Sequence, residues 1–141
     1  MRMAGYSGTP LARKLGIKPG ARVYVESAPE HYLALLEPLP ANVFFSPRLT
    51  GAFDLIHFFT KEARGLTAKL QVFQRALIDE GAIWVSWPKK AAKVATDVTE
   101  DVIRETALPL GLVDVKVCAV DEVWSGLKLV IRLVNRKSGK A

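Results

Sequence analysis

The stretch that most constrains the fold is a run of apolar and aromatic residues that ends at a proline. It spans Ala82–Trp87 and is followed by Pro88-Lys89-Lys90. A short, continuously apolar run of this kind is typical of a strand buried on both faces, as in the middle of a parallel sheet. Ligands of open α/β sheets bind outside the carboxyl ends of the strands. The two lysines therefore carry positive charge to the place where such a sheet binds its ligands.

Length and composition predict a single globular domain. The chain has 141 residues, of which 50% are hydrophobic and 24% charged, enough to bury one core and too apolar to stay disordered. We expect residues 1–134 to form one α/β domain with an N-terminal helix, and residues 135–141 to be a basic, flexible tail. The formal net charge is +6, but Arg136, Lys137 and Lys140 belong to that tail. A cationic tail is more often a solubilising end than a binding arm, which disfavours nucleic acid as the partner.

The few cysteines and histidines narrow the classes of protein further. Cys118 is the one cysteine, so an internal disulfide is excluded and a reducing setting is the simplest interpretation. The two histidines are His31 and His57. We expect His57 to be a hydrogen-bonded core residue. A single cysteine and two histidines without a paired spacing predict no metal site. Neither a signal peptide nor an apolar run of ~20 residues, the length of a membrane span, is evident. We therefore expect a cytoplasmic protein that does not contact the membrane.

Strand-like and helix-like patterns alternate along the chain. Strands are predicted over Arg22–Glu26, Val43–Phe45, Asp54–Phe59, Ala82–Trp87, Leu112–Val120 and Leu127–Val134. Helices are predicted over Leu11–Leu15 and His31–Glu37, from Leu66 through Leu77 to a stop at Gly81, and from a cap at Asp97 to Leu108. Thr9 and Pro10 are expected to cap and start the first helix. Ser125-Gly126 is expected at the reversal between the last two strands.

This order of elements predicts a three-layer, Rossmann-like α/β fold. Its sheet should be mostly parallel, with about six strands, and should end in a C-terminal antiparallel hairpin. Right-handed crossovers then place helices on both faces of the sheet. Trp84 and Trp87 are three positions apart, so in a strand they should point to opposite faces, both into the core.

Three segments resemble the Rossmann-like methyltransferases that use S-adenosylmethionine (SAM). Residues 15–23 resemble the lead into their first strand, residues 54–59 their central strand that begins with aspartate, and residues 77–88 a later helix end, glycine turn and strand. The resemblance implies a methyltransferase-like fold trimmed by about one strand–helix unit.

The same resemblance implies a cofactor site, and two segments depart from it. These enzymes have a glycine-rich loop after the first strand, where the backbone approaches the cofactor closely, and an acidic residue for the ribose after the second. Here the first position reads Glu26-Ser27-Ala28-Pro29-Glu30 and the second reads Phe44-Phe45-Ser46-Pro47. SAM is therefore disfavoured although the fold would admit it, and we expect no cofactor.

A second resemblance is carried by three short phrases. They are residues 5–10 (Gly-Tyr-Ser-Gly-Thr-Pro), residues 87–90 (Trp-Pro-Lys-Lys) and residues 121–126 (Asp-Glu-Val-Trp-Ser-Gly). On these phrases the chain resembles a bacterial family, the domain-of-unknown-function family 3052. That family implies no established activity.

The predicted topology gathers polar and aromatic side chains at the carboxyl edge of the sheet. The candidate ligand-binding residues are Tyr6, Ser7, Thr9, Glu26, Lys89, Lys90, Asp121, Glu122 and Trp124. Lysine ammonium groups, helix-start amides and an aromatic ring for stacking would form a cradle for a small anion or nucleotide. The alternative is that Lys89 pairs with Asp121, or Lys90 with Glu122, simply to join the loops.

Three functional hypotheses follow from these residues. The first is a non-catalytic module that binds a small anionic ligand, a nucleotide or a protein partner at this edge. The second is a divergent SAM-dependent methyltransferase, against which the missing glycine loop and acidic residue argue. The third is a homo-oligomeric interaction protein, such as a homodimer formed through the edge strand of the terminal hairpin. No residue is assigned a catalytic role, so enzymatic activity stays open.

Overall fold

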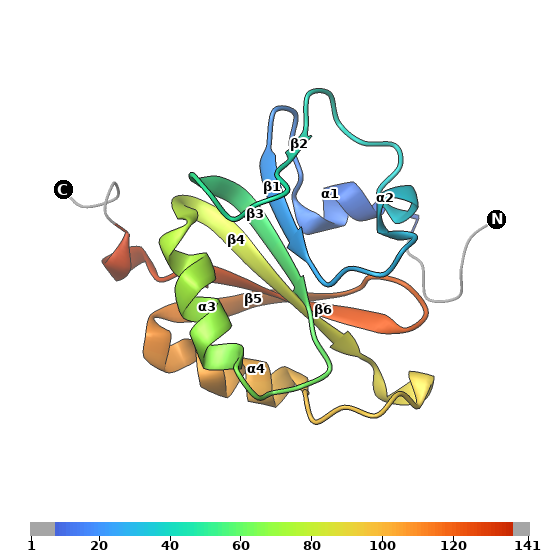
Figure 1. The fold of residues 1–141 in the computed structure, drawn as a ribbon, viewed down its shortest axis with the longest axis vertical. Helices are drawn as coiled ribbons and strands as arrows, with labels where there is room; N and C mark the ends of the chain where they lie inside the picture. The colour runs from blue at the N-terminus through green and yellow to red at the C-terminus, as the bar shows by residue number, and fades with distance from the viewer. Residues whose placement is uncertain (1–7, 137–141) are drawn as a thin grey trace.

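The computed structural model describes residues 8–136 and shows a six-stranded sheet between two layers of helices (Figure 1). The strands are β1 (Arg22–Glu26), β2 (Phe44–Phe45), β3 (Phe53–Phe59), β4 (Leu77–Pro88), β5 (Leu112–Ala119) and β6 (Trp124–Ile131). They are ordered β2-β1-β3-β4-β6-β5. The first four are parallel, whereas β6 runs antiparallel to both β4 and β5. The predicted α/β class, with its closing antiparallel hairpin, is confirmed.

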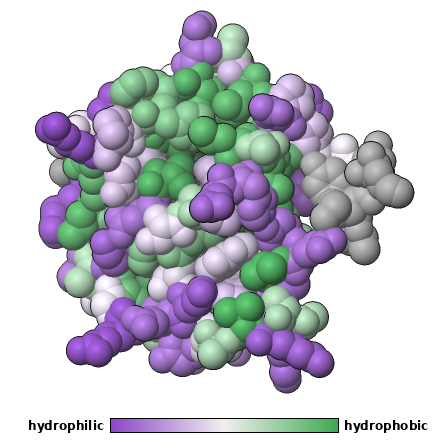
Figure 2. Space-filling view, turned by 45° about the vertical axis from the view of Figure 1, so that its right-hand side comes forward, coloured by the Kyte–Doolittle hydropathy of each residue, from purple (hydrophilic) through white to green (hydrophobic). Residues whose placement is uncertain are grey.

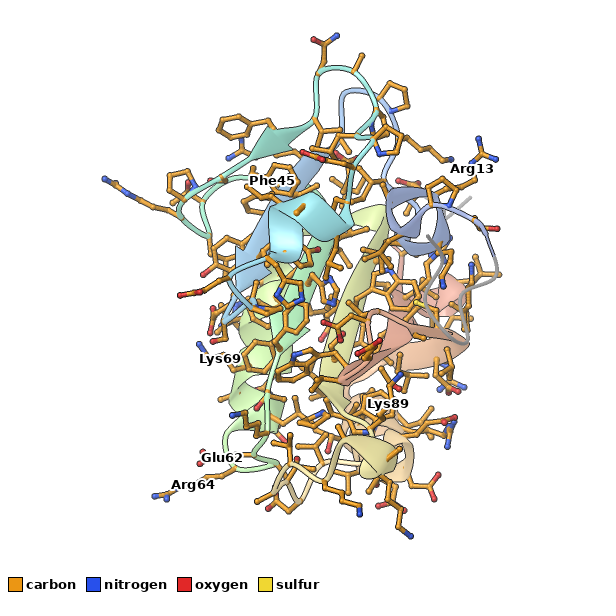
Figure 3. The ribbon with its side chains drawn as sticks, turned by 90° about the vertical axis from the view of Figure 1, so that its right-hand side faces the viewer. Arg13, Phe45, Glu62, Arg64, Lys69 and Lys89 are labelled. Carbon is orange, nitrogen blue, oxygen red and sulfur yellow. The ribbon has the colours of Figure 1, made fainter. Side chains whose placement is uncertain are left out.

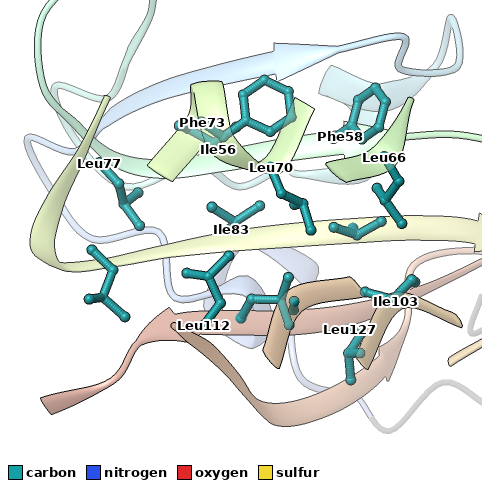
Figure 4. Packing of buried hydrophobic residues seen from close by; sticks show 14 of the residues in the cluster. Ile56, Phe58, Leu66, Leu70, Phe73, Leu77, Ile83, Ile103, Leu112 and Leu127 are labelled. Atoms are coloured by element: carbon teal, nitrogen blue, oxygen red, sulfur yellow. The ribbon is translucent and has the colours of Figure 1, made fainter. Parts of the chain in front are cut away.

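Helices cover both faces of this sheet, as the right-handed crossovers predict (Figure 1). The α helices are α1 (Leu11–Leu15), α2 (Tyr32–Leu35), α3 (Leu66–Arg75) and α4 (Glu100–Ala107), and the short 3-10 helices are η1 (Lys90–Ala92), η2 (Leu108–Leu110) and η3 (Leu133–Asn135). Helices α3 and α4 pack on one face around a large apolar core (Figure 4), and α1 and α2 pack on the other. We call these the α3/α4 face and the α1/α2 face.

The stretch from Ala82 to Trp87 forms the buried part of β4, between β3 and β6. Trp87 belongs to the core on the α3/α4 face and Trp84 to the core on the α1/α2 face, which confirms the predicted alternation. The indole N–H of Trp84 is buried, and it donates a 2.8 Å hydrogen bond to the Leu15 carbonyl at the end of α1. This bond fixes α1 over the centre of the sheet.

The predicted boundary between the third helix and β4 is wrong. Helix α3 ends at Arg75, and β4 already begins at Leu77. The spacing misleads because Leu77 joins the same apolar core as the helix residues, but it reaches that core from the strand. Gly81 does not stop a helix. It lies beside the register shift between β3 and β4, where a Cβ atom would come within 2.9 Å of the Asp54 carbonyl oxygen.

The predicted reversal of the terminal hairpin is also misplaced. Residues 120–123 make the turn, and Gly126 lies inside β6, paired with Ser86 of β4 and Cys118 of β5. A Cβ atom at Gly126 would lie 3.1 Å from the Ser86 hydroxyl oxygen, so the glycine allows close packing there. Strand β6 ends at Ile131, short of the predicted end at Val134.

Two predicted helix caps differ from those observed. Helix α1 has Pro10 in the N-cap position with no side-chain capping bond, instead of Thr9. Helix α4 is capped by Thr99, whose hydroxyl accepts a hydrogen bond from the Val102 amide at 3.1 Å. The Asp97 carboxylate instead accepts a 2.7 Å bond from the Ala63 amide, and so joins the loops before α3 and α4.

The predicted basic tail lies mostly outside the described residues, which end before Lys137. Within the described part, the guanidinium of Arg136 donates a 2.9 Å bond from Nε to the Ile131 carbonyl. Across residues 8–136, no helix is both long and apolar enough to cross a membrane.

Candidate functional site

The carboxyl ends of β1, β3 and β4 and the start of β6 share one edge of the sheet, which faces the viewer in Figure 3. We call it the carboxyl edge. It carries two separate features, one around Phe45 and the other around Lys89, which lie apart in Figure 3. The first is an open pocket and the second a polar cluster at the turn before β6.

The pocket lies where β1 and β2 end, and we call it the β1–β2 pocket. Its volume is about 360 Å³, within the range of small-molecule sites. It is lined by Val25, Ala28, Pro29, Glu30, Tyr32, Leu33, Phe45, Ser46 and Pro47. The lining is mainly apolar, and apolar side chains gather in the upper part of the space-filling view, at the height of β2 and α2 (Figure 2).

The local sequence explains how this pocket forms. After β1 the chain turns sharply at Ser27, which adopts a left-handed conformation with φ of 63°. That conformation disfavours any residue other than glycine by roughly 1–2 kcal/mol. Pro29 then directs the chain into the short helix α2. On the other side, Pro47 follows β2, which is only two residues long, and leaves Phe45 as a wall.

One wall of the pocket is anchored through the core by a chain of three polar side chains. The Tyr32 hydroxyl lies 2.8 Å from Nδ1 of His57, and Nε2 of His57 lies 2.7 Å from the Ser86 hydroxyl. His57 and Ser86 are fully buried and Tyr32 nearly so, so each polar group satisfies the next. Burial lowers the pKa of His57 to about 3 and raises the pKa of Tyr32. The imidazole is therefore neutral at pH 7, as expected for a core histidine.

A second link joins the loop after β1 to the turn before β6. Nε2 of His31 lies 2.9 Å from a carboxylate oxygen of Asp121. The other carboxylate oxygen accepts 2.8 Å bonds from the amides of Val123 and Trp124. Partial burial tends to raise the pKa of Asp121, but the hydrogen bonds from Trp124, His31 and Val123 outweigh it and lower that pKa. Asp121 thus shapes the turn and holds the loop beside the pocket.

The predicted lysine–carboxylate pairs are not the contacts that form. The ammonium of Lys89 donates a 2.9 Å bond to the main-chain carbonyl of Asp121, and the Lys89 amide bonds to the Val123 carbonyl. Lys90 and Glu122 are exposed. Within the described chain, neither Lys89 nor Lys90 takes part in a salt bridge. The Lys89 ammonium is therefore engaged by the turn itself.

Three other predicted site residues can also be placed. Glu26 turns toward the α3/α4 face, where it pairs with Lys69 and accepts a 3.0 Å bond from the Tyr24 hydroxyl. Trp124 starts β6 and packs edge-to-face on Phe59, with ring centroids 5.1 Å apart. Thr9 directly precedes the N-cap residue of α1.

The predicted site therefore separates into parts. The structure brings Lys89, Asp121 and Trp124 together, and it turns Glu26 away from them. Tyr6 and Ser7 lie outside the described residues. Sequence reasoning missed the β1–β2 pocket, although a signal was present: Glu26–Glu30 and Phe44–Pro47, the two departures from the methyltransferase pattern, supply most of its lining.

The chemistry of the pocket is that of binding. The rings of Tyr32, Phe45 and the two prolines give flat apolar surfaces, and Glu30 adds a carboxylate that accepts hydrogen bonds from hydroxyl groups. No lysine or arginine is among the lining residues. His57 and Ser86 form a base–hydroxyl pair, but both are buried away from the pocket space. Residues 8–136 contain no cluster of three side chains that would hold a metal ion.

The fold places the protein in the methyltransferase-like class of α/β proteins. A protein from Sulfolobus solfataricus provisionally classed as a type 11 methyltransferase superposes with a TM-score of 0.62 at 13% identity, covering 86% of this chain and 89% of the other. A TehB-like SAM-dependent methyltransferase from Corynebacterium glutamicum gives 0.55 at 15% identity, covering 92% and 91%. Magnesium protoporphyrin IX methyltransferase from Synechocystis, with bound SAM, gives 0.58 at 12% identity, covering 86% and 74%. At these identities the likeness shows the fold alone.

The family assignment is more specific. The family model described as "Protein of unknown function (DUF3052)" matches residues 50–133, which is more than half of the chain, so the protein belongs to this family. The resemblance predicted from the short phrases is thereby confirmed. Comparison with curated proteins gave no match.

Proposed function

We propose that this protein binds a nucleoside-like small molecule, a planar heteroaromatic ring that carries a hydroxylated sugar, in the β1–β2 pocket. One observation carries the proposal: an apolar, ring-lined pocket lies at the carboxyl ends of two neighbouring parallel strands. Open α/β sheets bind their ligands at this edge. The base would lie against Phe45, and the Glu30 carboxylate would accept hydrogen bonds from the sugar hydroxyls.

The charge of the lining favours some nucleosides over others. Glu30 is its only charged residue. The hydroxyl of Ser46 is already engaged, since it donates a 2.6 Å bond to the Arg48 carbonyl. A phosphate placed here would face a carboxylate and no cation, which is unfavourable. We therefore expect neutral or cationic nucleosides to bind more tightly than nucleotides.

SAM, the cofactor of methyltransferases with this fold, fits the pocket only in part. Its nucleoside end matches the rings and the carboxylate described above. The rest would need close approach to the backbone after β1, but the side chains of Ala28 and Pro29 line the pocket there, and Pro29 has no N–H to donate. No methyl-transfer step is proposed for these residues.

Titration calorimetry with adenosine, S-adenosylhomocysteine and ATP tests the proposal. We expect adenosine to bind and Phe45→Ala to weaken it at least about tenfold, since aromatic–base stacking is worth roughly 1–3 kcal/mol. Phe44→Ala is the matched control, because Phe44 is the neighbouring exposed ring outside the pocket lining. Equal losses in the two variants, or no heat with any of the three compounds, would overturn the proposal.

A divergent SAM-dependent methyltransferase is the second candidate, and the likeness of the fold to solved methyltransferases favours it. A further titration, with S-adenosylmethionine under the same conditions, separates the two. Binding of S-adenosylmethionine more than tenfold tighter than adenosine would show that the methionine part is also recognised. That result would favour the methyltransferase over the simple nucleoside-binding protein.

The edge strand argues against a homodimer formed through the terminal hairpin. Strand β5 is the edge strand, and its pairing with β6 shifts register between Asp114 and Lys116. Bulges and lysines on an edge strand are devices that block strand-to-strand association. Light scattering at two concentrations should therefore report a monomer.

A further inference from the structure

A second pocket lies on the α1/α2 face, between the end of α1 and the loop that follows α2. Its volume is about 510 Å³, within the range of small-molecule sites. The end of α1 and the turn into β1 form one wall, and residues 38–40 form the other. We call it the proline pocket, because its lining includes Pro10, Pro19, Pro38 and Pro40.

The way in which α1 ends builds the first wall. The Ile17 amide bonds to the Ala12 carbonyl at 2.9 Å, and the Gly16 amide bonds to the Arg13 carbonyl at 3.0 Å. These two bonds form a Schellman motif, in which Gly16 has the left-handed conformation that the motif requires, with φ of 87°. Ala12 and Ile17 are both buried, and both line the pocket. This wall is therefore set by the helix cap and needs no ligand to form.

The two walls are also tied to each other. The Gly20 amide donates a 2.9 Å bond to the Ala41 carbonyl, which joins the turn before β1 to the loop before β2. Each of these residues directly follows a lining proline, Pro19 or Pro40. A proline fixes its own φ angle, so both segments have few alternative conformations. A site that is already ordered loses little conformational entropy when a ligand binds.

The charge of the proline pocket is opposite to that of the β1–β2 pocket. Arg13 and Lys18 are its charged lining residues, whereas the β1–β2 pocket has Glu30 alone. Glu37 directly precedes Pro38 in the chain, but it is not among the lining residues. No salt bridge within residues 8–136 includes Arg13 or Lys18, and both residues are exposed. The rim of the pocket therefore carries positive charge that a bound anion would neutralise.

We propose that the proline pocket binds a small aromatic carboxylate, with its ring against the prolines and its carboxylate paired with Arg13 and Lys18. Proline rings pack well on flat aromatic rings, as in the docking of Pro-rich segments into aromatic-lined grooves. A guanidinium binds a carboxylate through two parallel hydrogen bonds, and an ammonium adds a second positive charge. The apolar lining and the two cations thus match the two halves of such a ligand.

The proline pocket is separate from the β1–β2 pocket. The two share no lining residue. Pro19 and Pro40 precede the parallel strands β1 and β2, so the proline pocket lies toward the amino ends of the strands, whereas the other pocket lies at their carboxyl ends. Arg13 and Phe45, one from each pocket, lie apart in Figure 3. The two ligands are therefore expected to bind without competing.

The test is a nuclear magnetic resonance titration of the isotopically labelled full chain with 2-naphthoate and with 2-naphthamide, its uncharged analogue. We expect the amides of Gly16, Ile17 and Leu39 to shift together in one saturable process. Naphthoate should bind about fivefold more tightly than naphthamide, which is the difference expected for one partly exposed ion pair.

Three variants separate the charge contribution from the apolar one. Arg13→Gln should weaken naphthoate binding about threefold to fivefold and leave naphthamide binding unchanged, because only the carboxylate uses the charge. Leu39→Ala removes apolar contact and should weaken both compounds alike. Arg64→Gln is the matched control, since Arg64 is also exposed and lies far from Arg13 in Figure 3, and it should leave both affinities unchanged. The dispersion of the amide resonances shows that each variant is folded.

Three results would contradict this assignment. The first is equal weakening by Arg13→Gln and Arg64→Gln, which would mean that only net charge matters. The second is equal affinity for naphthoate and naphthamide, or no shifts at millimolar naphthoate. The third is loss of naphthoate binding in Phe45→Ala, which would place the compound in the β1–β2 pocket.

Discussion

The two faces of the sheet are built for different purposes. The α3/α4 face has two longer helices over a continuous apolar core, and Arg104 on that face is neutralised by carboxylates. The α1/α2 face has two very short helices and the buried Tyr32–His57–Ser86 chain. One face therefore supplies most of the apolar packing, whereas the other also contains buried polar side chains that hydrogen-bond to one another.

The comparison extends to the sequence. The family match covers residues 50–133, which include β3, β4, β5 and β6 with the α3/α4 face. The β1–β2 pocket is formed by residues 25–47, outside that match. The part of the chain that matches the family therefore builds most of the scaffold, and the preceding part builds the pocket.

The largest effect should come from opening a cavity on the α3/α4 face. Phe73 in α3 is fully buried, so Phe73→Ala should lower the free energy of unfolding by about 3–5 kcal/mol in urea denaturation. The adjacent Val72 is 41% exposed, and Val72→Ala should change it by no more than about 0.5 kcal/mol. A loss below 1 kcal/mol for Phe73→Ala would show that this face is not the main source of stability.

On the α1/α2 face, His57 should make stability depend on pH. Its folded pKa of about 3 lies below the unfolded value of 6.5, so the unfolded chain binds a proton that the folded chain rejects. The stabilisation is complete above pH 6.5 and is lost as the pH falls toward 3, by at most about 1.4 kcal/mol per pH unit. Urea denaturation of wild type and His57→Gln between pH 7 and 4 should show a shallower slope for the variant. Parallel slopes would contradict the neutral, buried imidazole.

Each face has a tyrosine whose hydroxyl makes a hydrogen bond, Tyr32 on the α1/α2 face and Tyr24 on the α3/α4 face. Removing each hydroxyl therefore compares the two faces directly. Tyr32→Phe leaves a buried ring nitrogen of His57 without its partner and should destabilise by about 1–3 kcal/mol. Tyr24→Phe, on the α3/α4 face, removes a bond to the more accessible Glu26 and should cost about 0.5–1 kcal/mol. Chemical denaturation measures both. If Tyr24→Phe were the more costly change, the buried polar chain would not be the anchor we describe.

The smallest effect should come from the link between the β1–α2 loop and the turn before β6. The His31 side chain is 56% exposed, so His31→Gln should change the free energy of unfolding by less than about 1 kcal/mol. Asp121→Asn should cost more, because Asp121 also accepts two main-chain amide bonds. Thermal melting that ranks the two variants in the opposite order would be inconsistent with this division of roles.

Much of the scaffold is predictable from the sequence, because the strands are apolar runs and strands alternate with helices along most of the chain. The β1 prediction agrees with the structure residue for residue, and Ala82–Trp87 is buried as predicted. Leu77 and Gly126 were misassigned for physical reasons. Leu77 fits the helical spacing of the residues before it although it begins a strand. A glycine such as Gly126 can mark close packing as well as a turn.

The sites were harder to predict, because they depend on which segments meet. The β1–β2 pocket exists only because α2 and the end of β2 pack beside each other. Which residues of β5 and β6 lie opposite each other depends on a register that a bulge shifts between Asp114 and Lys116. Neither the bulge nor the turn at residues 120–123 has a unique signal in the sequence.

The central claim, that the β1–β2 pocket binds a nucleoside, is tested most directly by titrating adenosine into isotopically labelled protein and following the amide resonances. We predict that the amides of Ala28, Tyr32, Phe45 and Ser46 shift together in one saturable process, and that those near Lys116 do not move. Shifts confined to other segments, or no shifts at millimolar adenosine, would contradict the account.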